Sequence, residues 1–172
     1  MREFASDPPI EETVGDRLRE ADHTVAVAEG CTGGLVATLL TAAPGASDFL
    51  DRTLVPYSYD SLRELLALDR ELLDEHGVVS APVTRDLARA VRDTAGTTWG
   101  LATAGVAGPE GGTPEKPVGT AFVAVAYAGE LGSGSSTVSV ERYEVDGDRG
   151  AVRERVARRA LSDLDTHVRD RT

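Results

Sequence analysis

The sequence predicts one α/β domain spanning residues 1–172, a layered α/β/α sandwich around a mixed sheet. Two observations give the fold class. Short apolar runs typical of strands first alternate with amphipathic helical runs. Two consecutive strand-like runs, separated only by a Gly/Ser turn, then predict a hairpin. A third observation sets the domain count: no internal repeat or long linker divides the 172 residues, which are enough to bury a core.

The first third of the chain begins with a helix in segment 6–22, with Ser6 as its cap. Apolar residues recur there every four positions: Ile10, Val14 and Leu18. The apolar run 24–28 is typical of a buried strand. A helix over 33–43 follows and is stopped by a Pro-Gly pair. A second strand is expected over 53–58, at a sheet edge because it contains Pro56.

The remaining elements follow the same periodicities. Two short helices are expected over 60–68 and 69–77, and a longer helix over 80–96 with Ser80 as its cap. Three strands and a terminal helix come next, over 99–107, 120–128, 136–145 and 146–164, with Asp148 as the helix cap. The sheet is therefore mixed, and its ligand site is expected at the carboxyl ends of the parallel strands.

The charge balance excludes some functions. With 29 acids against 18 bases, the net charge is −11, which disfavours binding to a nucleic-acid backbone. Lys116 is the only lysine. This composition resembles that of halophilic archaeal proteins, although a GC-rich genome also replaces lysine by arginine. The sequence has no apolar run long enough to span a membrane and no apolar signal core, so a cytoplasmic protein is expected.

Metal and cofactor sites are not predicted. The three histidines, His23, His76 and His167, are scattered without the spacing of metal ligands. The single cysteine, Cys31, cannot form an internal disulfide.

The loop "AEGCTGG", residues 28–34, joins a predicted strand to a predicted helix. Backbone N–H groups at such a junction bind anions, and Thr32, Gly33 and Gly34 are the candidates for a phosphate or carboxylate cradle. The alternative is a tight turn without a ligand. Cys31 is more typical of a buried small residue than of a nucleophile, although a helix N-terminus would lower its pKa.

The loop "AGVAGPEGGTPEKPVG", residues 104–119, is the second candidate. Its glycines and prolines make it stiff and shaped, as functional loops commonly are. Lys116 lies in it, and a compact ammonium suits a phosphate, although a single lysine can also fall there by chance. Arg149, at the start of the last helix, is either a surface residue or a ligand for a substrate anion.

Together these segments resemble the CinA C-terminal domain family, which includes stand-alone nicotinamide mononucleotide deamidases. The motifs "AEGCTGG", "PYSYDS", "EHGVVS", "GVAGPEGGTPEKPVG" and "GDRGAVR" occur in the family order, from about residue 8 to the end. The resemblance implies a layered α/β domain, often dimeric, and a site for a pyridine mononucleotide. It also implies hydrolysis of the carboxamide to an acid and ammonia, as in pyridine nucleotide salvage, by a serine nucleophile with a lysine base.

The sequence departs from the family at the positions that carry this chemistry. Gly30 stands at the serine, Leu62 at the lysine and Tyr59 at an asparagine, and Ala104 replaces a Ser or Thr. Loss of such groups typically costs on the order of 10⁴ to 10⁶ in rate. Rescue by Cys31 or Thr32, or by the nearby Ser58 or Ser61, is the alternative, but no new base accompanies them.

Three functions follow as hypotheses. The first is a protein that binds a pyridine mononucleotide or related nucleotide with little or no hydrolysis, in a homodimer without metal or cofactor. The second is an active amidohydrolase whose substitute nucleophile is Cys31 or Thr32. The third is a structural subunit that pairs with an active paralogue. The expected ligand-binding residues are Glu29, Thr32, Gly33, Gly34, Tyr57, Ser58, Gly105, Gly108, Gly111, Gly112, Thr113, Lys116 and Arg149.

Overall fold

The computed structural model describes residues 3–172 and contains a five-stranded sheet in the order β2-β1-β3-β4-β5. The strands are β1 Val25–Glu29, β2 Leu50–Leu54, β3 Trp99–Gly105, β4 Thr120–Tyr127 and β5 Thr137–Glu144. β1 runs parallel to both β2 and β3, whereas β4 runs antiparallel to β3 and β5. The predicted mixed sheet and the β4–β5 hairpin are confirmed.

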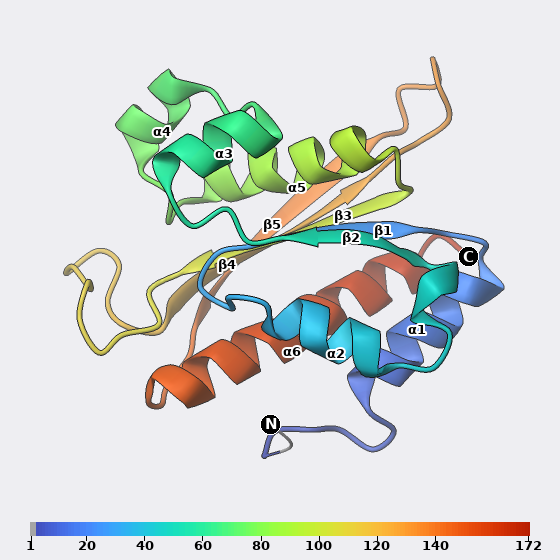
Figure 1. Ribbon diagram of the computed structural model, residues 1–172, viewed down its shortest axis with the longest axis horizontal. Coiled ribbons are helices and arrows are strands. Elements are labelled where there is room, and N and C mark those ends of the chain that lie inside the picture. Colours follow the sequence, from blue (N-terminus) through green and yellow to red (C-terminus); the bar gives the residue numbers. More distant parts are fainter. Residues whose placement is uncertain (1–2) are drawn as a thin grey trace.

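Helices cover both faces of the sheet, as Figure 1 shows. The lower face in that view carries α1 Ile10–Glu20, α2 Leu35–Ala42 and α6 Arg149–Arg169. The upper face carries α3 Tyr59–Leu66, α4 Arg70–His76 and α5 Ala81–Ala95, and a short 3-10 turn, Ala46–Asp48, precedes β2. The predicted α/β/α layering and the order of the main elements are therefore confirmed.

The strand side chains on the two faces of the sheet differ in size because the helices pack at different distances from the strand backbone. Large residues such as Trp99, Leu101 and Leu161 fill the lower core, beneath the sheet. The upper core has mostly alanines on the strand side, including Ala26, Ala28 and Ala102. Gly100 shows why: a Cβ there would lie 2.0 Å from the carbonyl oxygen of Ala88 in α5, so this helix packs directly on the strand backbone.

Several predicted boundaries and caps were wrong. β2 spans Leu50–Leu54 rather than 53–58 and ends before Pro56, which cannot donate a ladder hydrogen bond. Its place at the sheet edge is as expected. Ser6 does not cap α1, which begins at Ile10 after Pro9, and α6 continues beyond 164 to Arg169. Ser80 precedes α5, but its hydroxyl donates backwards to the Gly77 carbonyl at 2.8 Å.

The parallel arrangement of β2, β1 and β3 determines where the candidate loops lie. Their carboxyl ends share one edge of the sheet, at the left in Figure 1, so the loops after Glu29, Leu54 and Gly105 emerge together. The N-terminal end of α6 lies below the same edge. The segments singled out in the sequence therefore gather at one place.

Candidate functional site

The N-terminus of α2 is already occupied by a carboxylate of the chain itself. Glu29 is fully buried, and its two oxygens accept hydrogen bonds from the backbone N–H groups of Gly34, Val36 and Ala37 at 2.9, 3.1 and 2.8 Å. A charged side chain at a helix N-terminus is stabilised both by these bonds and by the helix dipole. The backbone N–H groups that were expected to bind an external anion are therefore hydrogen-bonded to Glu29.

The two glycines of this loop serve the turn into α2. Gly33 and Gly34 have φ values of 57° and 93°, in the left-handed region that favours glycine. The Gly33 N–H donates to the Gly30 carbonyl at 3.1 Å, and the Gly34 N–H is held by Glu29. For these two residues the geometry favours the alternative of a tight strand-to-helix turn.

The two candidate substitute nucleophiles, Cys31 and Thr32, are buried beneath the sheet. The Thr32 hydroxyl is fully buried and shares a hydrogen bond of 2.8 Å with the hydroxyl of Thr103 on β3. Cys31 packs into the lower core, where burial raises the pKa of its thiol to about 12. The Glu29 carboxylate adds to this rise, whereas Arg153 and the backbone N–H groups of Cys31 and Thr32 oppose it.

The replaced family positions lie on the other face of the sheet. Leu62 in α3 is 2% exposed and belongs to the upper core, together with Ala28 and Ala102. Ala104 follows Ala102 by two residues, and side chains at this spacing share a face. A Cβ on Gly30 would lie 3.4 Å from the Ala104 Cα and 2.8 Å from the Thr103 carbonyl oxygen. Position 30 is thus next to Ala104. Ala104 and Leu62 lie on the upper face of the sheet, whereas Cys31 lies beneath it.

The segment that follows β2 holds the next group of candidates. Ser58 and Ser61 form a reciprocal capping box at the start of α3, because each hydroxyl accepts the backbone N–H of the other residue. Both serines thus have a local structural role. Tyr57 is 69% exposed, and Tyr59 is also exposed. Tyr57 therefore presents a free aromatic face at the edge of the sheet where the loops gather.

The loop after β3 is fixed to helices on both faces of the sheet. The Lys116 ammonium donates to the His76 carbonyl at the end of α4, at 3.3 Å. From below, the Arg149 guanidinium donates to the Gly108 carbonyl at 2.7 Å. Within the loop, Thr113 and Lys116 form a turn through bonds of 2.9 and 3.1 Å. Lys116 and Arg149, which were predicted to bind a phosphate, therefore hold the loop to helices on opposite faces of the sheet.

The glycines of this loop allow close contacts. A Cβ on Gly105 would lie 2.9 Å from the Cys31 sulfur, and one on Gly108 would lie 2.6 Å from the Val118 side chain. A Cβ on Gly112 would meet the Val118 backbone nitrogen at 2.8 Å, and Gly111 has a φ of 89°. These positions accept only glycine without a local shift, so the loop has a defined shape.

Arg153 is a site residue that the sequence reasoning missed. Its guanidinium donates to the Thr32 and Gly33 carbonyls at 2.9 and 3.3 Å and so holds the loop after β1. Arg153 and Arg149 are four residues apart in α6, a spacing that places both on one face of the helix. The four-residue spacing of the two arginines in the motif "GDRGAVR" was the feature of the sequence that could have indicated a role for Arg153. Each arginine fixes a different loop of the site.

Within residues 3–172, no group of three or more His, Cys, Asp or Glu side chains is placed to hold a metal ion. The helices of the same part of the chain are too short or too polar to cross a bilayer.

The family model "CinA C-terminal domain" matches residues 7–168. A CinA-like protein of Anaeromyxobacter sp. (strain K) is 47% identical over 153 residues, which cover 89% of this chain and 36% of that protein. One of Chlorobium limicola is 38% identical over 164 residues, covering 95% of this chain and 38% of that protein. The chain thus spans about a third of the length of these curated relatives.

Solved structures match over nearly their whole length. The competence/damage inducible protein from Agrobacterium tumefaciens has a TM-score of 0.86 and 31% identity, covering 98% of this chain and 99% of that chain. A competence-damaged protein (CinA) superfamily protein from Klebsiella pneumoniae also has a TM-score of 0.86, with 28% identity and coverages of 94% and 96%. The chain belongs to the CinA C-terminal domain family.

Proposed function

We propose that this protein binds a pyridine mononucleotide or a related nucleotide at the shared edge of β1, β2 and β3 without hydrolysing its amide. The observation that carries the proposal is the chemistry of positions 30 and 62. Where the family has a nucleophile and a base, Gly30 has no side chain and Leu62 is a core residue, 2% exposed. Neither position offers a group that can attack a carbonyl or accept a proton.

The residues adjacent in sequence are poor substitutes. Cys31 lies in the lower core, on the opposite side of the sheet from Leu62, and its thiol remains protonated at neutral pH because burial raises its pKa to about 12. Thr32 is buried against Thr103. A nucleophile must lie within hydrogen-bond reach of a base and of the substrate carbonyl, and even a shift of about 1 Å can cost 10²-fold in rate. Burial thus disfavours the amidohydrolase hypothesis.

Binding is supported by the cations around the loops. In a chain with a net charge of −11, Lys116, Arg149 and Arg153 all belong to the group of loops at this edge. Each side chain uses some donors on loop carbonyls and retains others, because an ammonium has three and a guanidinium five. A phosphate there would form charge-assisted bonds with fixed side chains. The exposed Tyr57 ring offers a face for stacking an aromatic base.

The test combines binding with product analysis. Calorimetry with nicotinamide mononucleotide in high salt should show binding, and ammonia release should not exceed background. Arg149→Ala should weaken the affinity by about 1.5 kcal/mol, or roughly tenfold, through a lost charge-assisted bond. Arg52→Ala is the matched control, because Arg52 is an exposed arginine on β2 that pairs with Asp51. The control should bind like the wild type.

Each hypothesis has a distinct outcome. Ammonia release that is abolished by Cys31→Ala would establish the amidohydrolase. Absence of binding to nicotinamide mononucleotide, nicotinic acid mononucleotide and adenosine monophosphate at high protein concentration would reject the binding function. A stable complex with an active paralogue, without ligand binding, would then identify a structural subunit.

A further inference from the structure

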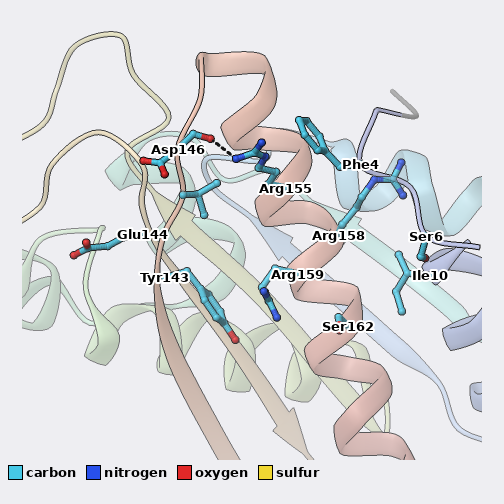
Figure 2. A pocket seen from close by; sticks show the side chains of 11 residues that line it. Phe4, Ser6, Ile10, Tyr143, Glu144, Asp146, Arg155, Arg158, Arg159 and Ser162 are labelled. Carbon is cyan, nitrogen blue, oxygen red and sulfur yellow. Dashed lines mark hydrogen bonds between the residues drawn. The ribbon is translucent and has the colours of Figure 1, made fainter.

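A cavity of about 540 Å³ lies on the side of α6 away from the candidate site. Its walls come from three separate parts of the chain: the N-terminal segment with the start of α1, the end of β5 and the middle of α6 (Figure 2). The residues that matter for its chemistry are Phe4, Ile10, Tyr143, Arg155, Arg158 and Arg159. The cavity is formed by residues other than those of the proposed nucleotide site.

Two of its arginines are held in place by aromatic rings. The Arg155 guanidinium lies over the Phe4 ring, 4.3 Å from its centroid, and that of Arg159 lies over Tyr143 at 5.0 Å. The Tyr143 hydroxyl donates to the Asp163 carboxylate at 2.8 Å, which fixes the ring under Arg159. Stacking of this kind orders a guanidinium while leaving its in-plane N–H groups available.

The same two arginines have few protein acceptors. Arg155 donates to the Asp146 carbonyl at 2.8 Å, a neutral partner that leaves its charge unbalanced. Arg159 has no hydrogen bond or ion pair with any residue in the range 3–172, and Asp163, which interacts with it electrostatically, is already hydrogen-bonded to Tyr143. The carboxylates of Glu144 and Asp146 point away from α6 in Figure 2. Among the described residues, Arg155 and Arg159 are thus the lining arginines without a bonded carboxylate.

Arg158 differs from its neighbours. It forms ion pairs with Glu154 at 3.0 Å and with Glu11 at 3.4 Å, and its side chain is only 8% exposed. These pairs join α6 to α1, so Arg158 forms a neutralised wall of the cavity. The remaining positive charge belongs to Arg155 and Arg159, one helical turn apart and separated by about 6 Å along the axis.

We propose that this cavity binds a small phosphate monoester that carries a flat ring. A phosphate dianion suits either of these two arginines, because a guanidinium can donate two parallel hydrogen bonds to phosphate oxygens. Phe4, Ile10 and Val145 give the lining apolar surface that accommodates the ring. The volume is within the range of small-molecule sites. The expected ligand therefore has an anionic phosphate group attached to a flat apolar ring.

The experiment uses phenyl phosphate as the probe, with inorganic phosphate and benzoate as comparison ligands, and follows binding by calorimetry and NMR. Phenyl phosphate should bind more tightly than either comparison ligand. Arg159→Gln and Arg155→Gln should each weaken binding about tenfold, as expected from the loss of a charge-assisted hydrogen bond. Arg171→Gln is the matched control, because Arg171 is also stacked on a tyrosine, Tyr127, at 4.2 Å but lies outside the cavity.

A second control separates this site from the nucleotide site. Phenyl phosphate can also occupy the nucleotide site, so binding to the cavity is read from the NMR signals of Tyr143 and Arg159, and their changes on adding phenyl phosphate should persist in Arg153→Gln. Circular dichroism checks that each variant is folded. The proposal is overturned if phenyl phosphate binds with the same affinity to the Arg155 and Arg159 variants as to the wild type, or does not bind at all. It is also overturned if inorganic phosphate binds equally well, because the apolar surface would then contribute nothing.

Discussion

Glu29→Gln tests whether the buried carboxylate closes the N-terminus of α2. The carboxylate accepts three backbone N–H bonds through both of its oxygens. Glutamine has the same shape but only one oxygen. In its better orientation the amide oxygen keeps the bonds to Gly34 and Val36, while its NH₂ group faces the N–H of Ala37. One hydrogen bond is then lost and two lose the contribution of the negative charge.

The magnitude follows from these bonds. A hydrogen bond to a charged group contributes about 1.5–3 kcal/mol, and part of the total loss is offset because glutamine avoids the cost of burying a charge. We expect a net loss of about 3 kcal/mol in the free energy of unfolding. For a domain of this size that corresponds to a fall of roughly 6–12 °C in Tm. Thermal unfolding followed by circular dichroism measures it.

The matched control is Asp148→Asn. Asp148 caps α6 through one bond to the Ala151 N–H at 2.9 Å, and it is exposed, so asparagine should cap nearly as well. An unchanged Tm in Glu29→Gln would refute the reasoning. It would mean that the carboxylate does not stabilise α2 and that its amides are available to an external anion after all.

Three further predictions concern the site and the surface. Cys31 should react slowly with a thiol-specific disulfide reagent between pH 7 and 10, because burial raises its pKa to about 12 and the thiolate forms only near that pH; a rate that climbs through pH 8.5 would contradict this. Gly30→Ser should lower the Tm and gain no ammonia release, because its Cβ would approach the Thr103 carbonyl to 2.8 Å and no base faces it; an unchanged Tm would show that β3 shifts freely. The Tm should rise from dilute to molar KCl if the net charge of −11 destabilises the fold by repulsion, whereas a flat profile would favour genomic bias in composition.

The element order could be predicted from the sequence because each element carries a local periodic signal. Ile10, Val14 and Leu18 predicted α1, and two of them, Val14 and Leu18, are fully buried. Boundaries depend on pairing and were less accurate. The apolar residues after Leu54 suggested that the second strand continues, but β2 pairs with β1 only as far as Ala28 and ends where that ladder ends.

The sequence predicted which loops lie together at one edge of the sheet, and the location of a ligand site there stays a prediction. The strand-loop-helix pattern predicted an anion site at the N-terminus of α2, but the amides there are bonded to Glu29 from the same chain. Whether such amides are free depends on the direction of one side chain, which local sequence does not determine. Similarly, Cys31 is adjacent to Gly30 in sequence, yet it packs beneath the sheet rather than towards the α3 side.

The cavity beside α6 could not have been predicted from the sequence. Phe4, Tyr143 and Arg159 come from segments far apart in the chain, and they are brought together only when α6 packs against α1 and the sheet. Each residue is unremarkable in its local pattern. Ion pairs such as Arg158–Glu11 and stacks such as Arg159–Tyr143 are set by tertiary structure alone.

The central claim is that the protein binds a nucleotide that it does not hydrolyse, and a single-turnover measurement tests it most directly. The protein, in excess over nicotinamide mononucleotide, is first shown by calorimetry to hold the ligand. The bound material is then recovered after prolonged incubation and separated by chromatography. The account predicts intact nicotinamide mononucleotide, because Gly30 and Leu62 provide neither nucleophile nor base. Recovery of nicotinic acid mononucleotide and an equivalent of ammonia, absent from a protein-free control, would contradict it.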